Sequence, residues 1–272
     1  MLPLLTSQVA VFIDTQKVVA TRYTNSFRKK IAHHETILLE PRADQNEILN
    51  LIEILSDLFN KKDFKGYSTK LILSPHYTKQ RVVQWKTELS TEDQKAILRH
   101  QLTDLYGFSG DSIEVVLSDQ GYKKNTIAFT VDKILFKAIN DLVSEKKIKS
   151  VSITPNFATR INYWHKTISQ NAWIIVHEQK VVHFARVIEN DWQSINTYSL
   201  SEISTLATIF NRELLFQEAA DYSNIYLMTD HPEMFKDKAV TLVRNTQQKC
   251  FVLCPKNINQ FSLDQRFLAF LD

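Results

Sequence analysis

Three carboxylate side chains lie near the ends of predicted strands, where paired acids often hold a divalent metal ion. They are Asp14, Glu178 and Asp230. Two such acids sharing Mg²⁺ could activate water in a metal-dependent nuclease of the ribonuclease H type. The competing explanation is that acids at strand ends lie in solvated turns, and no basic groove for a nucleic acid accompanies these three. We therefore expect no metal site and keep the nuclease as an alternative.

The histidines and cysteines form no recognisable ligand set. No H-E-x-x-H or comparable spacing occurs. His177 and His183 are expected to oppose each other across a hairpin, which places two imidazoles together without a third ligand. Cys250 and Cys254 flank a strand-like run, and residues four apart in a strand are separated by about 13 Å, too far for a disulfide. We expect two buried free thiols.

Glycine is scarce, with four in 272 residues, whereas average usage of about 7% predicts roughly nineteen. Phosphate-binding loops bring backbone N–H groups close to an anion, commonly at φ values that a Cβ disfavours, and so depend on glycine. Neither G-x-G-x-x-G nor G-x-x-x-x-G-K-[ST] occurs. The sequence therefore argues against nucleotide chemistry, and it predicts neither a cofactor nor a catalytic residue.

The charge and hydropathy patterns limit the classes of partner. The chain has 33 basic and 30 acidic residues, a net charge of +3. A nucleic-acid-binding domain of this size normally shows a basic stripe with interleaved aromatic residues, and none is visible. The longest apolar runs are strand-length, far short of the roughly 20 residues of a membrane helix, and no signal peptide is recognisable. We expect a cytoplasmic protein without nucleic-acid partners or membrane insertion.

Hydrophobic spacing predicts a β-rich α/β unit in the first part of the chain. Alternating apolar residues predict an opening hairpin and further short strands, and three-and-four spacing predicts amphipathic helices. The expected strands are 8–14, 17–23, 31–40, 70–73, 112–117, 126–130 and 150–153, and the expected helices are 46–60, 91–106 and 133–145.

The same order of elements begins again after residue 168. The second set comprises strands 172–177, 181–188, 192–197, 224–228, 239–243 and 250–253, a long helix 203–219 and a short helix 233–236. Each half then begins with three strands followed by a helix, a strand and a helix, which suggests a duplicated β-β-β-α-β-α unit. We predict two domains, residues 1–168 and 169–272.

Dispersed motifs along residues 8–227 carry a family resemblance. They are LSPHY at 73–77, VVQW at 82–85, LYG at 105–107, VVLSD at 115–119, GY at 121–122, the segments 128–133 and 151–155, Asn162, Trp173, Trp192 and NRELL at 211–215. Together they resemble the bacterial PilM-like proteins and their relatives, the cytoplasmic domains of GspL-type secretion proteins. Both groups belong to the actin-like ATPase superfamily.

The resemblance implies an α/β protein with an actin-like ATPase fold, made of two ribonuclease-H-like lobes with mixed sheets. Nucleotide-binding members carry an Asp-x-Gly turn after the first strand of each lobe and a glycine-rich loop near the adenosine. The matching positions here are Asp14 with Gln16, Glu178 with Gln179, and Asp230, and none of these turns has its glycine. We therefore expect a pseudo-ATPase, with a divergent nucleotide-binding ATPase as the alternative.

The resemblance also implies partners in type IV pilus or type II secretion machinery. The partner is expected to be an inner-membrane platform protein or the extension motor ATPase, and the role that of a scaffold or of a motor regulator of the competence-pilus-inhibitor kind. Partners of this type could hold the protein peripherally at the inner membrane. Aromatic anchors are enriched at interfaces, so Trp85, Tyr77 and Tyr122 are the predicted docking residues, whereas Trp173 is predicted to lie in the core.

Overall fold

The structure, a computed structural model, describes most of the chain. It covers residues 7–24, 30–39, 47–86, 90–106, 110–118, 124–149, 151–178, 180–200, 206–215, 224–232 and 249–255, with Phe235, Arg266, Ala269 and Phe270. The predicted elements 233–236 and 239–243 lie outside the described residues, apart from Phe235.

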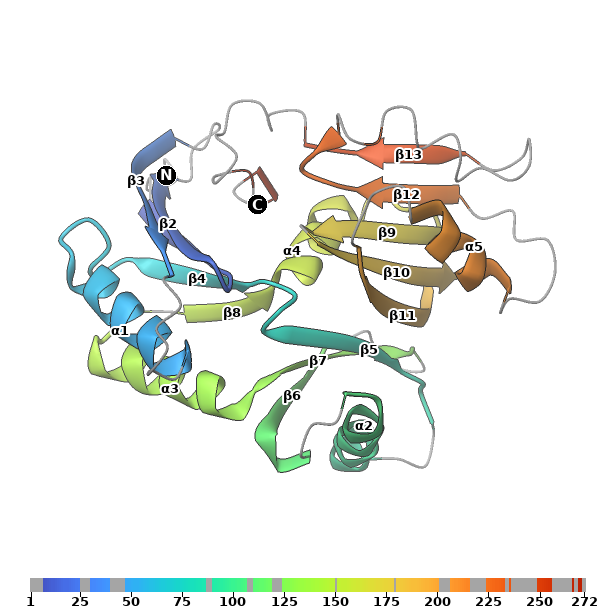
Figure 1. The fold of residues 1–272 in the computed structure, drawn as a ribbon, viewed down its shortest axis with the longest axis horizontal. Coiled ribbons are helices and arrows are strands. Elements are labelled where there is room, and N and C mark those ends of the chain that lie inside the picture. The colour runs from blue at the N-terminus through green and yellow to red at the C-terminus, as the bar shows by residue number, and fades with distance from the viewer. Residues whose placement is uncertain are drawn as a thin grey trace, which may run out of the picture.

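Two five-stranded mixed sheets have the same internal order (Figure 1). The first is β3 (Lys30–Leu38), β2 (Lys17–Thr24), β1 (Ser7–Ile13), β4 (Ser68–Leu73) and β8 (Val151–Pro155). The second is β11 (Asp191–Ser199), β10 (Val181–Ile188), β9 (Ala172–Glu178), β12 (Asn224–Met228) and β13 (Cys250–Leu253). In each sheet three antiparallel strands are followed by two parallel ones. The predicted pair of ribonuclease-H-like lobes is confirmed.

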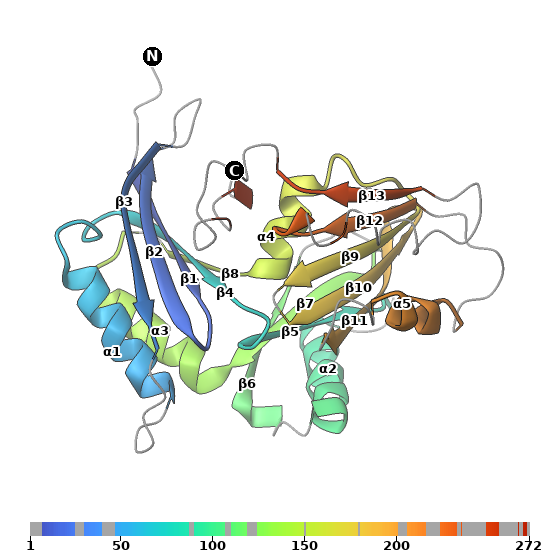
Figure 2. The ribbon, with the colours of Figure 1, turned by 45° about the horizontal axis from the view of Figure 1, so that its top comes forward.

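A third, three-stranded sheet lies beside the two lobes (Figure 2). Its order is β5 (Thr78–Val83), β7 (Thr126–Asp132), β6 (Ile113–Leu117), and helix α2 (Thr91–Tyr106) with the short η1 (Gly110–Ser112) belongs to the same segment. The predicted antiparallel pairing of β6 with β7 is confirmed. The predicted order of the first half is wrong after β4, because strand β5, which was not among the predicted elements, comes before α2. The Thr-Lys-Gln-Arg start of β5 shows no apolar alternation.

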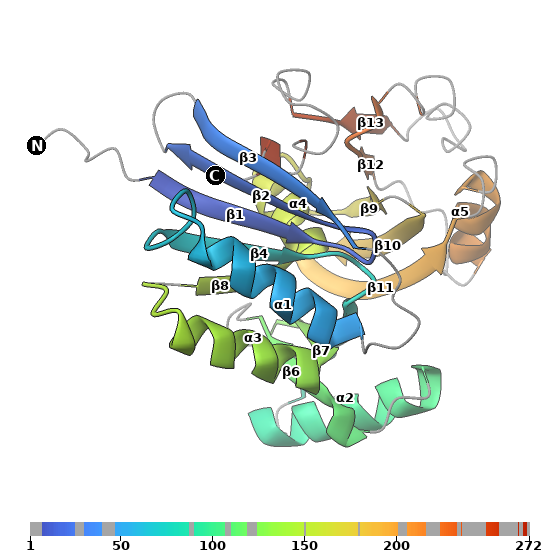
Figure 3. The same ribbon diagram turned by 60° about the vertical axis from the view of Figure 1, so that its left-hand side comes forward.

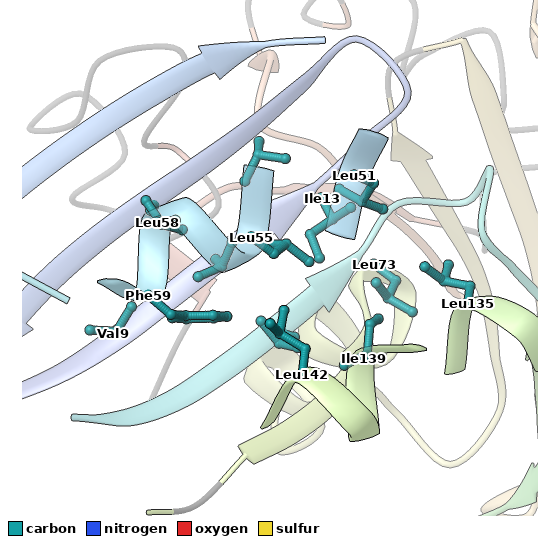
Figure 4. Close-up of a cluster of buried hydrophobic side chains, with 14 of the residues drawn as sticks. Val9, Ile13, Leu51, Leu55, Leu58, Phe59, Leu73, Leu135, Ile139 and Leu142 are labelled. Carbon is teal, nitrogen blue, oxygen red and sulfur yellow. The ribbon is translucent and has the colours of Figure 1, made fainter. Parts of the chain in front are cut away.

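The first lobe buries its core between its sheet and two helices, α1 (Glu47–Asn60) and α3 (Lys133–Glu145) (Figures 3 and 4). Leu51, Leu55 and Leu58 recur at three-and-four spacing on α1 and are fully buried against the sheet. Each such leucine stabilises the fold by roughly 1.5–3 kcal/mol. Helix α3 begins where the Asp132 carboxylate accepts the backbone N–H groups of Ile134 and Leu135.

The second lobe packs around Trp173, which is completely buried, as predicted. Its ring meets Phe210 of helix α5 (Leu206–Leu215) edge-on, with the centroids 5.4 Å apart. Phe184 of β10 stacks on the same phenylalanine. Helix α5 is described for ten residues within the predicted 203–219.

Helix α4 (Asn156–Trp164) runs from β8 of the first sheet towards β9 of the second and lies between them (Figures 1 and 2). It was not predicted, because it is short and its apolar residues Phe157 and Ile161 are interrupted by polar ones. Both pack into the core of the second lobe. The predicted domain boundary at residue 168 falls in the connection from α4 to β9 and remains a prediction.

Candidate functional site

Polar side chains from both lobes meet where strands of the two five-stranded sheets end. Asp14 follows β1 and Asn156 follows β8, and these parallel strands end at the same edge of the first sheet. Glu178 ends β9 and Asp230 follows β12, which are parallel in the second sheet. The charges of Asp14 and Asp230 both act on Glu178. The three predicted strand-end acids therefore belong to one junction between the lobes.

Glu178 is the centre of this junction. Its side chain is buried, and its Oε2 accepts a hydrogen bond of 2.8 Å from Nδ2 of Asn156 on α4. Burial raises its pKa from 4.5 to about 7, although the charge of Arg160 and the Asn156 hydrogen bond act in the opposite direction. The pKa of the Glu178 carboxyl therefore lies well above that of an ordinary glutamate.

Arg160 lies one turn after Asn156 on α4, so both face the junction. It is buried, its Nη2 is 3.2 Å from Oδ2 of Asp230, and its guanidinium stacks 4.4 Å from the ring centroid of Phe270. Burial would raise the pKa of Asp230, but the charges of Arg160 and His231 outweigh burial and lower it. Asp230 is therefore ionised at neutral pH.

His183 joins the third sheet to the second lobe. Its Nδ1 is 2.7 Å from Nε2 of Gln80 on β5 and 2.9 Å from the hydroxyl of Thr197 on β11. Its Nε2 is 3.7 Å from Oε1 of Glu178. Burial, together with the charges of Lys79 and Arg160, lowers the pKa of His183 to about 3, so the imidazole is neutral at pH 7 and does not form an ion pair with Glu178.

Two expectations from the sequence are wrong here. Asp14 and Glu178 are not in solvated turns, because 4% and 2% of their surfaces are exposed. His177 and His183 do not oppose each other, because His177 pairs with Val182 and the two imidazoles therefore lie on opposite faces of the sheet. His177 packs against Phe235, on the face away from Glu178. In the described part of the chain, no three His, Cys, Asp or Glu side chains are placed to hold a metal ion.

Gln16 and Gln179 occupy the other two positions that match nucleotide-binding turns. Gln16 is exposed in the turn between β1 and β2, where the Asp14 N–H donates to the Lys17 carbonyl at 3.0 Å. Gln179 lies outside the described residues. Cys250 and Cys254 form no disulfide and are only partly buried, not buried as expected, and burial raises the pKa of the Cys250 thiol to about 11.

Tyr77 lies in a groove between the first lobe and the third sheet. The groove has a volume of about 220 Å³ and is lined by the start of α1, the start of α3 and the third sheet, including Ile48, Leu135 and Ile113. The Tyr77 hydroxyl donates to Oε1 of Glu47 at 2.8 Å, and burial followed by this hydrogen bond raises the pKa of the phenol. Tyr77 therefore remains a neutral donor.

Two exposed apolar side chains lie close in sequence to residues that line this groove. Ile134 is 64% exposed and lies in the first turn of α3, two residues after the lining residue Asp132. Leu49 is 61% exposed and lies in the first turn of α1, directly after the lining residue Ile48.

The other two predicted docking residues are placed differently. Trp85 follows β5 and is half-buried, and its backbone N–H donates to Oδ1 of Asn125 at 2.8 Å. Nδ2 of Asn125 donates in turn to the Trp192 carbonyl on β11. Trp85 thus lies beside the contact between the third sheet and the second lobe, away from the lining of the Tyr77 groove. Tyr122 is outside the described residues.

Three residues of this junction, Asn156, Arg160 and Gln80, were not predicted from the sequence. The available signal was an Asn-x-x-x-Arg pair directly after the strand that ends at Pro155, because a helix starting there places both polar side chains on one face. Gln80 had no local signal, since its partner His183 is 103 residues away.

No protein-family model matches this chain. No curated protein matches it either. Among the described helices, none has the length and apolar character needed to cross a membrane.

Solved structures do match over nearly the whole chain. A Bacteroides thetaiotaomicron protein described as having an actin-like ATPase fold superposes with a TM-score of 0.61 at 11% identity, covering 98% of this chain and 96% of that one. The PilM–PilN type IV pilus biogenesis complex gives a TM-score of 0.61 at 8% identity, covering 96% and 94%. The cytoplasmic domain of EpsL, an inner-membrane component of the Vibrio cholerae type II secretion system, gives 0.55 at 10% identity, covering 97% and 93%. This chain therefore has the actin-like ATPase fold, which it shares with PilM and with the cytoplasmic domain of EpsL.

Proposed function

We propose that this protein is a non-catalytic, actin-like protein that binds a component of a type IV pilus or type II secretion machine. The observation that carries the proposal is the junction between the lobes, where buried side chains bond one another. Asn156 donates to Glu178, and Arg160 pairs with Asp230. The described turns at this position contain no glycine whose backbone N–H could approach a phosphate. We infer that these residues do not fit a bound nucleotide.

The proposed partner is an inner-membrane platform protein or the extension motor ATPase. PilM was solved with PilN and EpsL is an inner-membrane component, and these properties are carried to this chain as part of the proposal. The Tyr77 groove, with the exposed Ile134 and Leu49 beside it, is the proposed docking site for a segment of the partner. Its volume of about 220 Å³ suits a few side chains of an extended segment. The protein is then cytoplasmic and reaches the inner membrane through that partner.

The role is a scaffold or an inhibitor of the motor, and co-purification from the native cell distinguishes them. If the protein is a scaffold, the platform protein is expected to co-purify with it. If it is an inhibitor, the motor ATPase is expected to co-purify, and adding the protein is expected to lower the rate of ATP hydrolysis by the motor. Recovery of neither, together with no binding of either purified protein in solution, contradicts the proposal.

Mg-ATP is expected to leave the melting temperature unchanged. A nucleotide present at 100 times its dissociation constant would add about 2.7 kcal/mol to the free energy of unfolding. Thermal-shift titration of the wild type and of Asp14→Ala measures this directly. A rise of several degrees in the wild type that disappears in Asp14→Ala favours the divergent ATPase instead. Metal-dependent cleavage of RNA–DNA hybrids would favour the nuclease.

Trp85 is proposed as a second partner contact, separate from the Tyr77 groove, so replacing it with alanine is expected to weaken partner binding by roughly 2 kcal/mol, as for an interface anchor. The free energy of unfolding is expected to change by about 1 kcal/mol or less, because the side chain is only half-buried. Calorimetric titration of the recovered partner and urea unfolding give the two values. Unchanged affinity in a folded Trp85→Ala protein removes Trp85 from the docking surface.

A further inference from the structure

The Glu178 carboxyl connects elements that belong to different parts of the fold. Its Oε2 accepts from Asn156, the first residue of α4, which follows the last strand of the first sheet. Its Oε1 has no hydrogen-bond partner and faces Nε2 of His183 at 3.7 Å. His183 in turn contacts Gln80 of the third sheet. The Glu178 carboxyl therefore lies where side chains from all three sheets meet.

The charges around Glu178 only partly stabilise its ionised form. Arg160 on α4 favours the carboxylate, but its Nη2 pairs with Asp230, and its Nε and Nη1 have no hydrogen-bond partner. Asp230 after β12 and Asp14 after β1 both disfavour the carboxylate. His183 on β10 is neutral and supplies no positive charge. An ionised Glu178 is therefore buried without a cation of its own, which is costly.

We propose that Glu178 is a proton-binding site that controls the junction between the lobes. The neutral acid stays buried against Asn156 and keeps the junction closed. The ionised carboxylate favours an open arrangement, in which water reaches it. The proposal concerns the junction and does not depend on the identity of the docking partner.

The direction of the pH effect follows from linkage. The pKa of Glu178 is about 7 in the closed junction, against 4.5 for an ordinary glutamate. Because the closed form holds the proton more tightly, closure is fully favoured below pH 4.5 and is progressively lost as the pH rises towards 7. The opening constant is expected to rise by about tenfold per pH unit in that interval and to level off above it.

Hydrogen–deuterium exchange tests this dependence. Exchange of backbone amides at the start of α4 and the end of β9, corrected for the intrinsic pH dependence of exchange, is measured between pH 5 and 8.5. The wild type is expected to show the rise and the plateau. Glu178→Gln, which keeps an acceptor for Asn156 but cannot ionise, is expected to remain closed at every pH. Glu213→Gln is the matched control, because Glu213 is a buried acid that accepts hydrogen bonds from Asn196 and Tyr198, outside the junction. The pH dependence of junction opening in Glu213→Gln is expected to follow that of the wild type.

A second measurement on the wild type does not depend on any variant folding. The carbon-13 shift of the Glu178 carboxyl is expected to titrate with a midpoint near 7. A midpoint below about 5, the range of an ordinary glutamate, overturns the proposal. A pH-dependent opening that persists unchanged in Glu178→Gln overturns it as well.

Discussion

Arg160→Ala is expected to destabilise the fold by about 3 kcal/mol at pH 7, because it leaves the Asp230 carboxylate without its guanidinium partner. The substitution also removes the stacking on Phe270. Urea unfolding followed by tryptophan fluorescence measures the loss. Because Arg160 lowers the pKa of Asp230, that contribution is present above the ordinary Asp pKa of 3.8 and is lost as the pH falls through the lowered one. The penalty of the substitution is therefore expected to shrink in acid.

Arg81 is the matched control. Its Nη1 donates to Oδ1 of Asn196 at 3.0 Å, a contact with a neutral group and not with a carboxylate. Arg81→Ala is expected to cost about 1 kcal/mol, as for loss of a single hydrogen bond. Equal losses for the two arginines would contradict the importance of the Arg160–Asp230 pair. If Arg160→Ala does not fold, Arg160→Lys, which keeps the charge, is expected to fold with an intermediate stability.

Ile134→Asp is expected to weaken partner binding by about 3 kcal/mol, roughly 150-fold, because it places a charge in the proposed docking surface, next in sequence to the groove residue Leu135. The free protein is expected to unfold within about 0.5 kcal/mol of the wild type, since Ile134 is exposed. An acid in the first turn of α3 also suits the helix dipole. Calorimetric titration with the recovered platform or motor protein gives the affinity.

Ile97→Asp on α2 provides the control for this surface. Ile97 is another exposed isoleucine on a helix, 42% exposed, and does not line the groove. Its substitution is expected to leave the affinity unchanged. Equal weakening by both variants would indicate a general effect of the added charge, and no weakening by Ile134→Asp would place the docking site elsewhere.

Most of the two lobes could be predicted from local patterns. Leu51, Leu55 and Leu58 repeat at the helical period, and the Val- and Ile-rich runs of β9 and β10 are strand-like, so these elements are apparent in short windows. Strand β5 could not be predicted in this way. Its polar Thr-Lys-Gln-Arg start is stabilised by pairing with β7, about fifty residues later, including Gln80 with Phe129 and Arg81 with Ala128.

By itself, the sequence determined the repeated order of strands and the absence of glycine from the turns that would approach a phosphate, because hydrophobic periodicity and backbone freedom are local properties. Only the tertiary structure decided which side chains surround those turns and how deeply the turns are buried. The pKa of Glu178 is raised to about 7 because the fold buries its carboxyl beside Asn156, while the nearby Arg160 is paired with Asp230. Burial and the field of distant charges depend on the packing of all three sheets, so no window of sequence around Glu178 contains them.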